Sequence, residues 1–347
     1  MNNSSKLPYV LLAIVFIWLA ILSQDVSGIE RNTDTEQVIQ QDVNGFSTDF
    51  TRIIDENSAA VPSILSENGT ATGFAYRQDG DTVYILTAYH AVADATRLNV
   101  QFGSYRCEAT LTGFDPLTDL AVLEIKTPYE IPVLKTGDAT LLKRGEYVVL
   151  IGTPISQEYA GSVRTGMISS SITAVENAVT YEEQRYDYYL DVIQVSAELE
   201  NGYSGSPVLN MAGEVTGMIT MAPDSQLTFA VSINEIRKVA DLIISGEEVH
   251  RNLFGIRETY VRDMKNYEKS NLGLSVDTIS GIYALRVRET SPAYEAGVRT
   301  GDVITAINDV PIGSLDDYLS LCYGDYESFT FTVLRNGEAQ TLGVTHD

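Results

Sequence analysis

Cysteine, histidine and positive charge are all scarce in this sequence. Its 347 residues contain only two cysteines, Cys107 and Cys322, which lie far apart and outside any CxxC motif or histidine cluster. We therefore expect no disulfide framework and no metal site, and we interpret both residues as core thiols. Lys and Arg number 23 against 47 Asp and Glu, giving a formal net charge of -24. Because this surplus repels phosphates, nucleic acid is not an expected partner.

Long apolar runs are also rare, and the single strong one lies at the N-terminus. Residues 7–22 read LPYVLLAIVFIWLAIL, after the lone positive charge of Lys6. This pattern predicts an export signal, either an uncleaved transmembrane anchor or a peptide cleaved near Val26-Ser27-Gly28. We favour the anchor, which makes 1–28 a membrane-spanning segment. A buried core helix is disfavoured because no other segment offers a matching apolar surface. Both export forms place the remaining chain outside the cytoplasm, at the cell membrane or secreted.

The rest of the chain divides into four stretches by pattern. Residues 29–56 are polar with a helical spacing of apolar residues, which predicts a spacer with a short amphipathic helix. Residues 57–246 contain many short strand-like runs separated by turns, which is typical of a β-barrel or sandwich. Residues 247–269 are charged without a clear period and suggest a linker, and 270–347 form a second β-rich unit. The fold class is therefore mainly β.

Helix starts and stops punctuate the two β-rich units. Each expected helix begins at a serine that suits the N-cap position: Ser232, Ser291 and Ser314. Gly246 and Gly297 supply the stops for the first two. We predict that the helix opened by Ser232 runs to about Ile244 and closes the first β-rich unit.

His90 is the first candidate for chemistry. The other two histidines, His250 and His346, lie in the charged linker and near the C-terminus, whereas His90 sits in the apolar context ILTAYHAVADAT. A general base that works near neutral pH is most often a histidine. A lone histidine is more commonly a satisfied core residue, so His90 needs partners to support a catalytic role.

Two further motifs supply possible partners. Ser204 lies between Gly202 and Gly205 at the head of an apolar strand, where a glycine-rich turn lets backbone amides converge on a developing oxyanion. Asp119 directly precedes the apolar run AVL and is placed to accept the imidazole proton. Asp115, followed by proline, suits a turn-capping role better.

These three motifs together carry a family resemblance. TAYH, DPLTDLAVLEI and GYSGSPV occur in the order His, Asp, Ser, and they resemble the HtrA/Deg-type trypsin-like serine proteases over nearly all of residues 57–245. The resemblance implies a chymotrypsin-like double β-barrel in which Ser204 is the nucleophile, His90 the general base and Asp119 the orienting acid. It also implies an oxyanion hole formed by the amides of Gly202 and Ser204, and no cofactor or metal.

The nucleophile motif departs from the family's usual GNSGG. Tyr203 replaces a small polar residue and Ser206 replaces a glycine, without removing a reacting group. By position, the pocket for the residue before the scissile bond is lined by Leu199, Met221 and Ala222, which favours small or medium apolar side chains. If Glu198 points inward, a basic side chain is preferred instead.

Residues 270–347 resemble a bacterial PDZ domain. NLGLSV at 271–276 matches the carboxylate-binding loop, and SPAYEAGVRTGDVITAIND at 291–309 is the most recognisable stretch. The amides of Leu272, Gly273 and Leu274 are expected to bind a terminal carboxylate, with the peptide added as a strand. The resemblance also implies a homotrimer joined by N-terminal aromatic residues, a role for which Phe46 and Phe50 are placed, although ordinary core packing explains these two equally well.

Three functional hypotheses follow. The first is an extracytoplasmic serine endopeptidase that hydrolyses misfolded or regulatory proteins and whose PDZ domain binds peptide C-termini. The second is a catalytically silent scaffold that uses only the PDZ groove, which an intact triad disfavours. The third is a latent protease that becomes ordered when the PDZ domain binds peptide, with the loop at 176–187 as the relay.

Overall fold

The computed structural model describes residues 49–221, 228–278, 280–324, 326 and 328–345. Residues 52–347 form one unit, separate from residues 1–51. The predicted anchor at 1–28, most of the spacer and Phe46 lie outside the described residues. Within the described ranges, no helix is long and apolar enough to cross a membrane.

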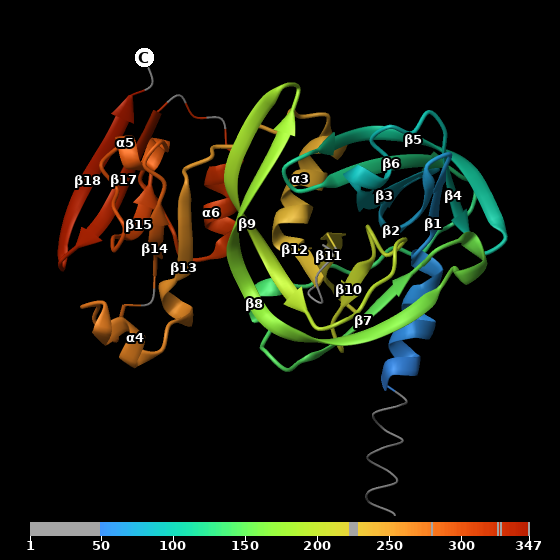
Figure 1. Cartoon of the computed structure of the whole chain (residues 1–347), viewed down its shortest axis with the longest axis horizontal. Coiled ribbons are helices and arrows are strands. Elements are labelled where there is room, and N and C mark those ends of the chain that lie inside the picture. Colours follow the sequence, from blue (N-terminus) through green and yellow to red (C-terminus); the bar gives the residue numbers. More distant parts are fainter. Residues whose placement is uncertain (1–48, 222–227, 279, 325, 327, 346–347) are drawn as a thin grey trace, which may run out of the picture. The chain divides into compact units, whose positions relative to one another are not determined.

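The first β-barrel is closed by six strands in the order β1-β2-β3-β6-β5-β4. Figure 1 shows these strands in blue to teal. Their bounds are β1 Ser63–Ser66, β2 Gly69–Asp79, β3 Thr82–Ala88, β4 Leu98–Phe102, β5 Tyr105–Asp115 and β6 Leu120–Lys126. Alternating apolar residues fill the interior, and residues such as Phe74, Leu86 and Leu123 have no exposed surface.

The second barrel is closed by strands in the order β10-β11-β12-β9-β8-β7. Their bounds are β7 Tyr147–Gly152, β8 Ser162–Tyr181, β9 Gln184–Val195, β10 Pro207–Leu209, β11 Val215–Met221 and β12 Thr228–Ser232. Each strand-like run in the sequence therefore corresponds to a strand. The prediction of trypsin-like barrels is confirmed.

One predicted loop is instead a long hairpin. The stretch 176–187 belongs to the β8–β9 hairpin, whose strands pair from Ile168↔Val195 to Tyr181↔Gln184. Glu182 and Glu183 form its two-residue turn, with φ of 49° and 65°. Such turns normally carry Gly, Asn or Asp, so the Glu-Glu pair gave no turn signal in the sequence.

Helix α3, Ile233–Ser245, follows the second barrel as predicted. The Ser232 side chain accepts a hydrogen bond from the Glu235 amide, and Gly246 ends the helix in the left-handed conformation with φ of 77°. The helix buries one face, including Ile236 and Val239. It therefore packs its apolar stripe on the barrels and exposes the other side.

The C-terminal sheet has the strand order β13-β14-β15-β17-β18, with β16 paired to β15. Its bounds are β13 Ile256–Tyr260, β14 Ile282–Val287, β15 Val303–Ile307, β16 Val310–Pro311, β17 Ser328–Arg335 and β18 Glu338–Thr345. Helices α4 Asn266–Asn271, α5 Pro292–Glu295 and α6 Leu315–Cys322 accompany it. Ser291 and Ser314 cap α5 and α6, as the sequence predicts.

The stretch predicted as a linker, 247–269, is more ordered than expected. It contains β13, which is hydrogen-bonded to β14 from Ile256↔Val287 to Tyr260↔Ile282. The C-terminal sheet therefore begins before residue 270. The sequence did not predict this strand because Arg257 and Glu258 interrupt its apolar residues.

Candidate active site

Antiparallel pairing of β3 with β6 brings His90 and Asp119 together. Ala88 is paired with Leu120, so the residues just after β3 and just before β6 lie at the same end of the sheet. His90 Nδ1 lies 2.6 Å from Asp119 Oδ2, and the His90 amide donates to Asp119 Oδ1 at 2.8 Å. Both carboxylate oxygens thus contact the same residue, which fixes the ring orientation.

Ser204 comes to this pair from the second barrel. Its Oγ lies 3.0 Å from His90 Nε2, so one imidazole joins the carboxylate and the hydroxyl. The two barrels are held at this point by Thr72, whose amide donates to the Ser204 carbonyl at 3.0 Å and whose hydroxyl donates to the Gly202 carbonyl at 2.7 Å. The three side chains singled out from sequence therefore meet in hydrogen-bonding order.

The electrostatics suit a proton-accepting histidine. The hydrogen bond to Asp119 raises the pKa of His90 above its usual value, burial opposes this, and the negative charge of Asp119 adds to it. The His90 side chain is 49% exposed and that of Asp119 is 21% exposed. His90 can therefore accept a proton from Ser204, because Asp119 stabilises the charged ring. The ring also remains accessible from solvent.

The turn that carries Ser204 requires two glycines. Gly202 has φ of 105°, and a Cβ there would lie 2.2 Å from the Thr153 carbonyl oxygen. Gly205 has φ of 84°, and its Cβ would lie 2.1 Å from the Thr72 carbonyl oxygen. No other residue fits at these positions without displacing backbone. Among the described residues, the amides of Gly202 and Ser204 have no hydrogen-bond acceptor.

The two departures from the family motif both point inward. Tyr203 is 1% exposed and Ser206 is fully buried. Both crowd Gly152, because a Cβ at Gly152 would lie 2.6 Å from the Tyr203 ring and 2.7 Å from Ser206 Oγ. Tyr203 and Ser206 are therefore packed in the interior beside Gly152.

The expected specificity pocket is only partly within the described residues. Leu199 is half-buried, whereas Ala222 and the side chain of Met221 lie outside what the structure describes. Glu198 is exposed, which gives no support to the alternative of an inward carboxylate selecting a basic substrate residue. Glu200 is turned toward Arg164, with 2.5 Å between Oε1 and Nη2.

The amides of the expected carboxylate-binding loop are already occupied. The Leu272 amide donates to Glu268, that of Gly273 to Ser270 at 3.1 Å, and that of Leu274 to the Lys269 carbonyl at 2.8 Å. These bonds end helix α4 and leave none of the three donors for a ligand. The glycine that suggested a binding loop is a helix stop, with φ of 71°.

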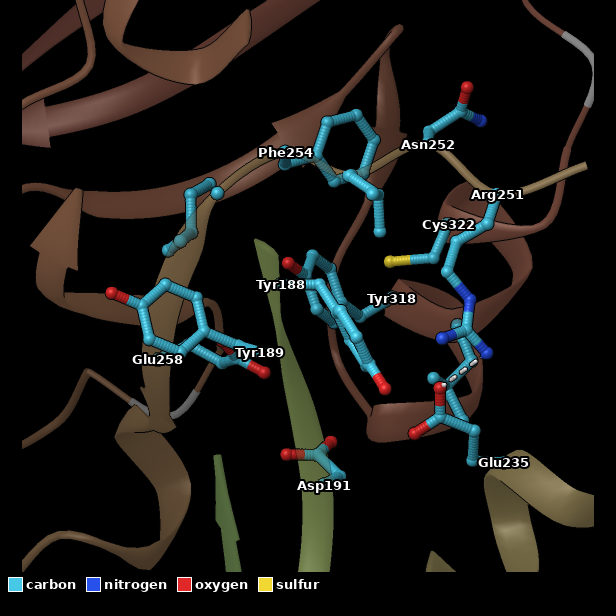
Figure 2. Close-up of a pocket in the computed structure, with 14 residues that line it drawn as sticks. Tyr188, Tyr189, Asp191, Glu235, Arg251, Asn252, Phe254, Glu258, Tyr318 and Cys322 are labelled. Carbon is cyan, nitrogen blue, oxygen red and sulfur yellow. Dashed lines mark ion pairs between the residues drawn. The ribbon is translucent and has the colours of Figure 1, made fainter. Parts of the chain in front are cut away.

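A second cluster of polar side chains, which no sequence motif predicts, lines a cavity away from Ser204. A cavity of about 40 Å³ is lined by residues of β9, α3, β13 and α6, and Figure 2 shows Asp191, Glu235 and Glu258 around it. Arg251 also lines this cavity, and none of the three residues meeting at Ser204 does. The residues of this cluster come from segments far apart in the chain, so no local sequence motif predicts the cluster.

The two cysteines are both free thiols and half-buried. His250 is exposed beside Glu248, with 3.4 Å between Nε2 and Oε2, and His346 lies outside the described residues. Within the described ranges, no group of three histidine, cysteine or carboxylate side chains is close enough to hold a metal ion.

Comparison with known proteins agrees with this geometry. Residues 71–218 match the trypsin-like peptidase domain and residues 283–335 match the PDZ domain. The chain is 32% identical to the serine protease Do-like HtrB of Bacillus subtilis (strain 168), over 79% of this chain and 61% of that protein. It is 28% identical to the serine protease Do-like HtrA of Lactococcus lactis subsp. lactis (strain IL1403), over 87% of this chain and 76% of that protein.

Solved structures show the same fold. The HtrA-type protease AlgW with tripeptide aligns with a TM-score of 0.58 at 25% identity, covering 85% of this chain and 96% of that one. The serine endoprotease from Yersinia pestis aligns with a TM-score of 0.52 at 24% identity, covering 85% and 96% respectively. The chain therefore belongs to the HtrA/Deg family of trypsin-like serine proteases that carry a PDZ domain.

Proposed function

We propose that this chain is a serine endopeptidase that hydrolyses unfolded or regulatory proteins, with Ser204, His90 and Asp119 as its catalytic residues. The observation that carries the proposal is the continuous contact from Asp119 through His90 to Ser204, at 2.6 Å and 3.0 Å. A half-exposed imidazole that bridges a carboxylate and a serine hydroxyl at a glycine-constrained turn is the arrangement that activates a serine nucleophile, and this supports the proposal.

The geometry supports an acyl-enzyme mechanism. Ser204 Oγ attacks the peptide carbonyl carbon while His90 Nε2 takes its proton, and Asp119 stabilises the resulting imidazolium. The C–N bond then breaks, and His90 returns the proton to the leaving amine. Water repeats the sequence on the ester and releases the acid. The free amides of Gly202 and Ser204 are the proposed donors to the oxyanion.

The test compares the wild-type chain with Ser204→Ala on a denatured model protein. Mass spectrometry of the products identifies the bonds cleaved, and an organophosphonate probe reports whether Ser204 reacts. We expect cleavage after small or medium apolar residues and loss of both signals in the variant. Cleavage by Ser204→Ala at a rate close to wild type would remove the assignment. A wild-type chain that neither cleaves nor reacts would favour the silent PDZ scaffold.

For the PDZ domain we propose peptide binding at the edge strand β13 rather than at residues 272–274. Among the described residues, β13 pairs in its sheet with β14 alone, so its other edge has no strand partner; strand addition at such an edge is the usual way in which PDZ domains take a peptide C-terminus. That edge is approached by the β8–β9 hairpin, since Arg257 Nε donates to the Ala174 carbonyl at 3.1 Å. A peptide would therefore compete with the hairpin.

The β8–β9 hairpin is the proposed relay between peptide binding and catalysis. On β8 Glu176 pairs with Arg288 at 3.1 Å, and at the end of β8 Tyr181 packs edge-on to Phe114 at 5.9 Å. Phe114 stacks at 4.2 Å on Tyr89, the residue before His90. In the full chain, Tyr181→Ala should abolish any rate change caused by a C-terminal peptide without affecting peptide binding. Unaltered stimulation in that variant would exclude this relay.

An extracytoplasmic location and a membrane anchor at residues 1–28 are part of the proposal. One relative, 31% identical over 79% of this chain, is named a probable periplasmic serine endoprotease of Pseudomonas putida (strain GB-1). A homotrimer is proposed on the family resemblance alone. Cell fractionation of the full chain tests the location, and sedimentation of the purified protein tests the assembly.

A further inference from the structure

The loop that presents Asp119, residues 115–119, has an uncommon backbone. Asp119 has φ of 56°, in the left-handed region that non-glycine residues seldom occupy. Its carbonyl accepts from the Tyr89 amide at 2.8 Å while its side chain contacts His90. Because the conformation is not the one an aspartate prefers, the loop needs other contacts to hold it.

Asp115 organises this loop from its first position. Its carboxylate accepts hydrogen bonds from the Leu117 amide at 3.3 Å, the Thr118 amide at 3.0 Å and the Thr118 hydroxyl at 2.6 Å. Asp115 and Thr118 are both buried. The sequence interpretation of Asp115 as a turn cap is thus confirmed, and this cap determines the path of the chain into Asp119.

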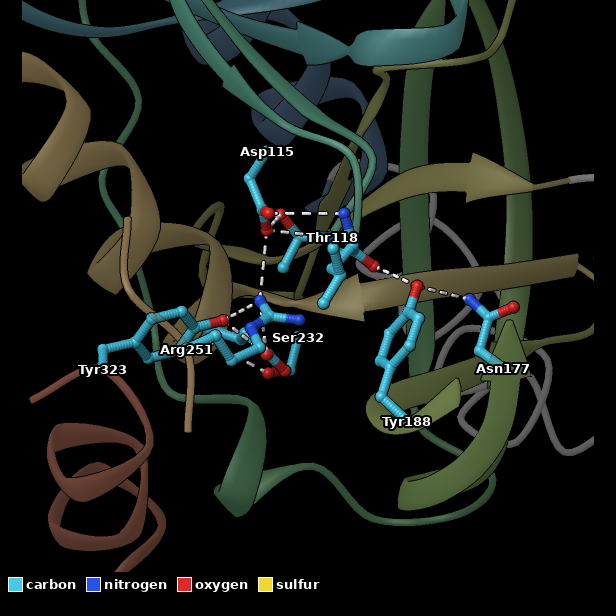
Figure 3. Close-up of polar contacts among 9 residues, drawn as sticks. Asp115, Thr118, Asn177, Tyr188, Ser232, Arg251 and Tyr323 are labelled. Atoms are coloured by element: carbon cyan, nitrogen blue, oxygen red, sulfur yellow. Dashed lines mark hydrogen bonds and ion pairs between the residues drawn. The ribbon is translucent and has the colours of Figure 1, made fainter. Parts of the chain in front are cut away.

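Arg251 fastens Asp115 from outside the barrels. Its Nη2 donates to Asp115 Oδ2 at 3.1 Å (Figure 3). The two side chains are only 9% and 8% exposed. Arg251 belongs to the segment between α3 and β13. A residue more than a hundred positions away from the loop therefore neutralises the carboxylate on which the loop is built.

Tyr188 holds the middle of the same loop. Its hydroxyl donates to the Leu117 carbonyl at 2.5 Å. The same hydroxyl accepts from Asn177 Nδ2 at 2.9 Å, and Figure 3 shows Asn177 beside Tyr188. The guanidinium carbon of Arg251 lies 5.9 Å from the Tyr188 ring centroid. The loop is thus held at two points, by a cation at Asp115 and by a phenol at Leu117.

The position of Arg251 is itself determined by several elements. It pairs with Glu235 of α3 at 3.2 Å and contacts the Tyr323 hydroxyl, with the ring centroid at 4.8 Å. Burial alone would lower the pKa of Arg251, but Tyr323, Asp115 and Glu235 raise it, so the side chain stays charged. The titratable or charged groups around it on the packed elements are Asp115, Tyr188, Tyr189, Asp191, Glu235, Glu258, Tyr318, Cys322 and Tyr323.

We propose that Arg251 is a positioning residue for Asp119, acting through Asp115, with Tyr188 as its partner at Leu117. The inference rests on the proposed function, because it explains how the acid of the triad is held in register with His90. Neither Arg251 nor Tyr188 touches the reacting atoms. Their effect is to keep the Asp119 carboxylate within hydrogen-bonding distance of the imidazole.

The experiment measures kcat, KM and the His90 titration in the full chain. Tyr188→Phe removes one hydroxyl, and Arg251→Met removes the cation while keeping part of the side-chain volume. In both we expect kcat to fall about 10- to 100-fold, as for partners that orient a reacting group, with KM little changed. We also expect the acid limb of kcat/KM to move to lower pH, because a displaced Asp119 no longer raises the pKa of His90.

The matched control is Arg335→Met, which breaks another part-buried arginine–aspartate pair, Arg335–Asp302 at 2.7 Å in the C-terminal sheet. It should lower stability and leave kcat and the acid limb unchanged. If Arg251→Met does not fold, kcat and the acid limb of the kcat/KM profile in Tyr188→Phe are the test of the proposal.

Unchanged kcat and an unchanged acid limb in Tyr188→Phe would overturn the proposal. A NMR titration of the His90 ring gives the same answer without turnover. It therefore separates failure of this inference from failure of the proposed activity.

Discussion

The charge cluster at Ser204 and the one around Arg251 differ in how their charges are matched. At the first, one imidazole faces one carboxylate, and both oxygens of Asp119 have a partner. At the second, Arg251 faces two carboxylates directly, at 3.1 Å and 3.2 Å, while Asp191 and Glu258 lie nearby. The first is half-exposed, and the second is buried.

The buried cluster also contains unmatched atoms. Glu258 Oε2 and the Nε and Nη1 atoms of Arg251 are buried without a partner among the described residues. Burial raises the pKa of Asp191, Glu235 and Glu258. Such groups seldom add stability, because desolvation offsets their attraction. We infer from this contrast that the exposed cluster suits proton transfer, whereas the buried cluster lowers stability and holds the loop at 115–119.

The sharpest test of this contrast exchanges each aspartate of the loop at 115–119 for asparagine. Asp119→Asn should lower kcat about 10⁴-fold, because the imidazole loses its acceptor and its useful tautomer. Asp115→Asn should lower kcat far less, about 10- to 100-fold, because Asp115 does not touch His90 and affects Asp119 only through the backbone of the loop. Steady-state kinetics on one peptide substrate measures both. Equal losses would erase the distinction between the two clusters.

The same kinetics carry a pH signature. His90 must be neutral to accept a proton, so activity rises as pH increases through its pKa, which Asp119 raises above the ordinary value of about 6.5. The limb should therefore move to lower pH in Asp119→Asn. A limb that stays in place would show that another group titrates.

The second prediction concerns the turn at Ser204. Gly202→Ala places a Cβ 2.2 Å from the Thr153 oxygen, so the turn and its amide must move. Loss of one oxyanion donor lowers kcat about 10²- to 10³-fold. Gly145→Ala is the control, since it has φ of 91° but no atom within 4 Å of its Cβ. Comparable kcat losses in the two variants would argue against an oxyanion role for Gly202.

The third prediction concerns the stability of the buried cluster. Because Asp191 has a raised pKa in the folded chain, the unfolded chain releases its proton first as pH rises above about 4. The free energy of unfolding therefore falls as pH rises toward the pKa that Asp191 has in the folded chain. Asp191→Asn should gain about 1 kcal/mol or more at pH 8 and nothing at pH 4, by denaturant unfolding. The exposed Asp187, whose pKa Arg185 lowers, should show no such gain on the same change.

The smallest effect is expected at the exposed contacts of the hairpin. Glu176→Gln removes ion pairs to Arg286 at 3.4 Å and Arg288 at 3.1 Å, but Glu176 is 55% exposed. Such pairs contribute between 0 and about 1 kcal/mol and weaken with salt. Glu56→Gln, which breaks a similar pair with Arg52 at 3.0 Å, is the control. A loss of several kcal/mol on thermal unfolding would mean that the hairpin contact is structural.

Local chemistry explains which features were foreseeable. The strands, the serine caps at Ser232 and Ser291, and the turn glycines at 202 and 205 all depend on residues within a few positions of one another. The Glu182-Glu183 turn and the short strand β13 escaped prediction because neither has the residues that usually mark such elements. At Gly273 the pattern was misleading, since a helix stop and a binding loop both use glycine.

The sequence alone determined the strand pattern, the family and the three residues that meet at Ser204. The contact of Arg251 with Asp115 and that of Tyr188 with Leu117 depend on how distant segments pack, and the occupied amides at 272–274 depend on how helix α4 ends. The difference arises because the two kinds of interaction act over different separations along the chain. Propensity, capping and turn chemistry act between neighbours in the chain, whereas the partner of a buried charge depends on which distant segments pack together.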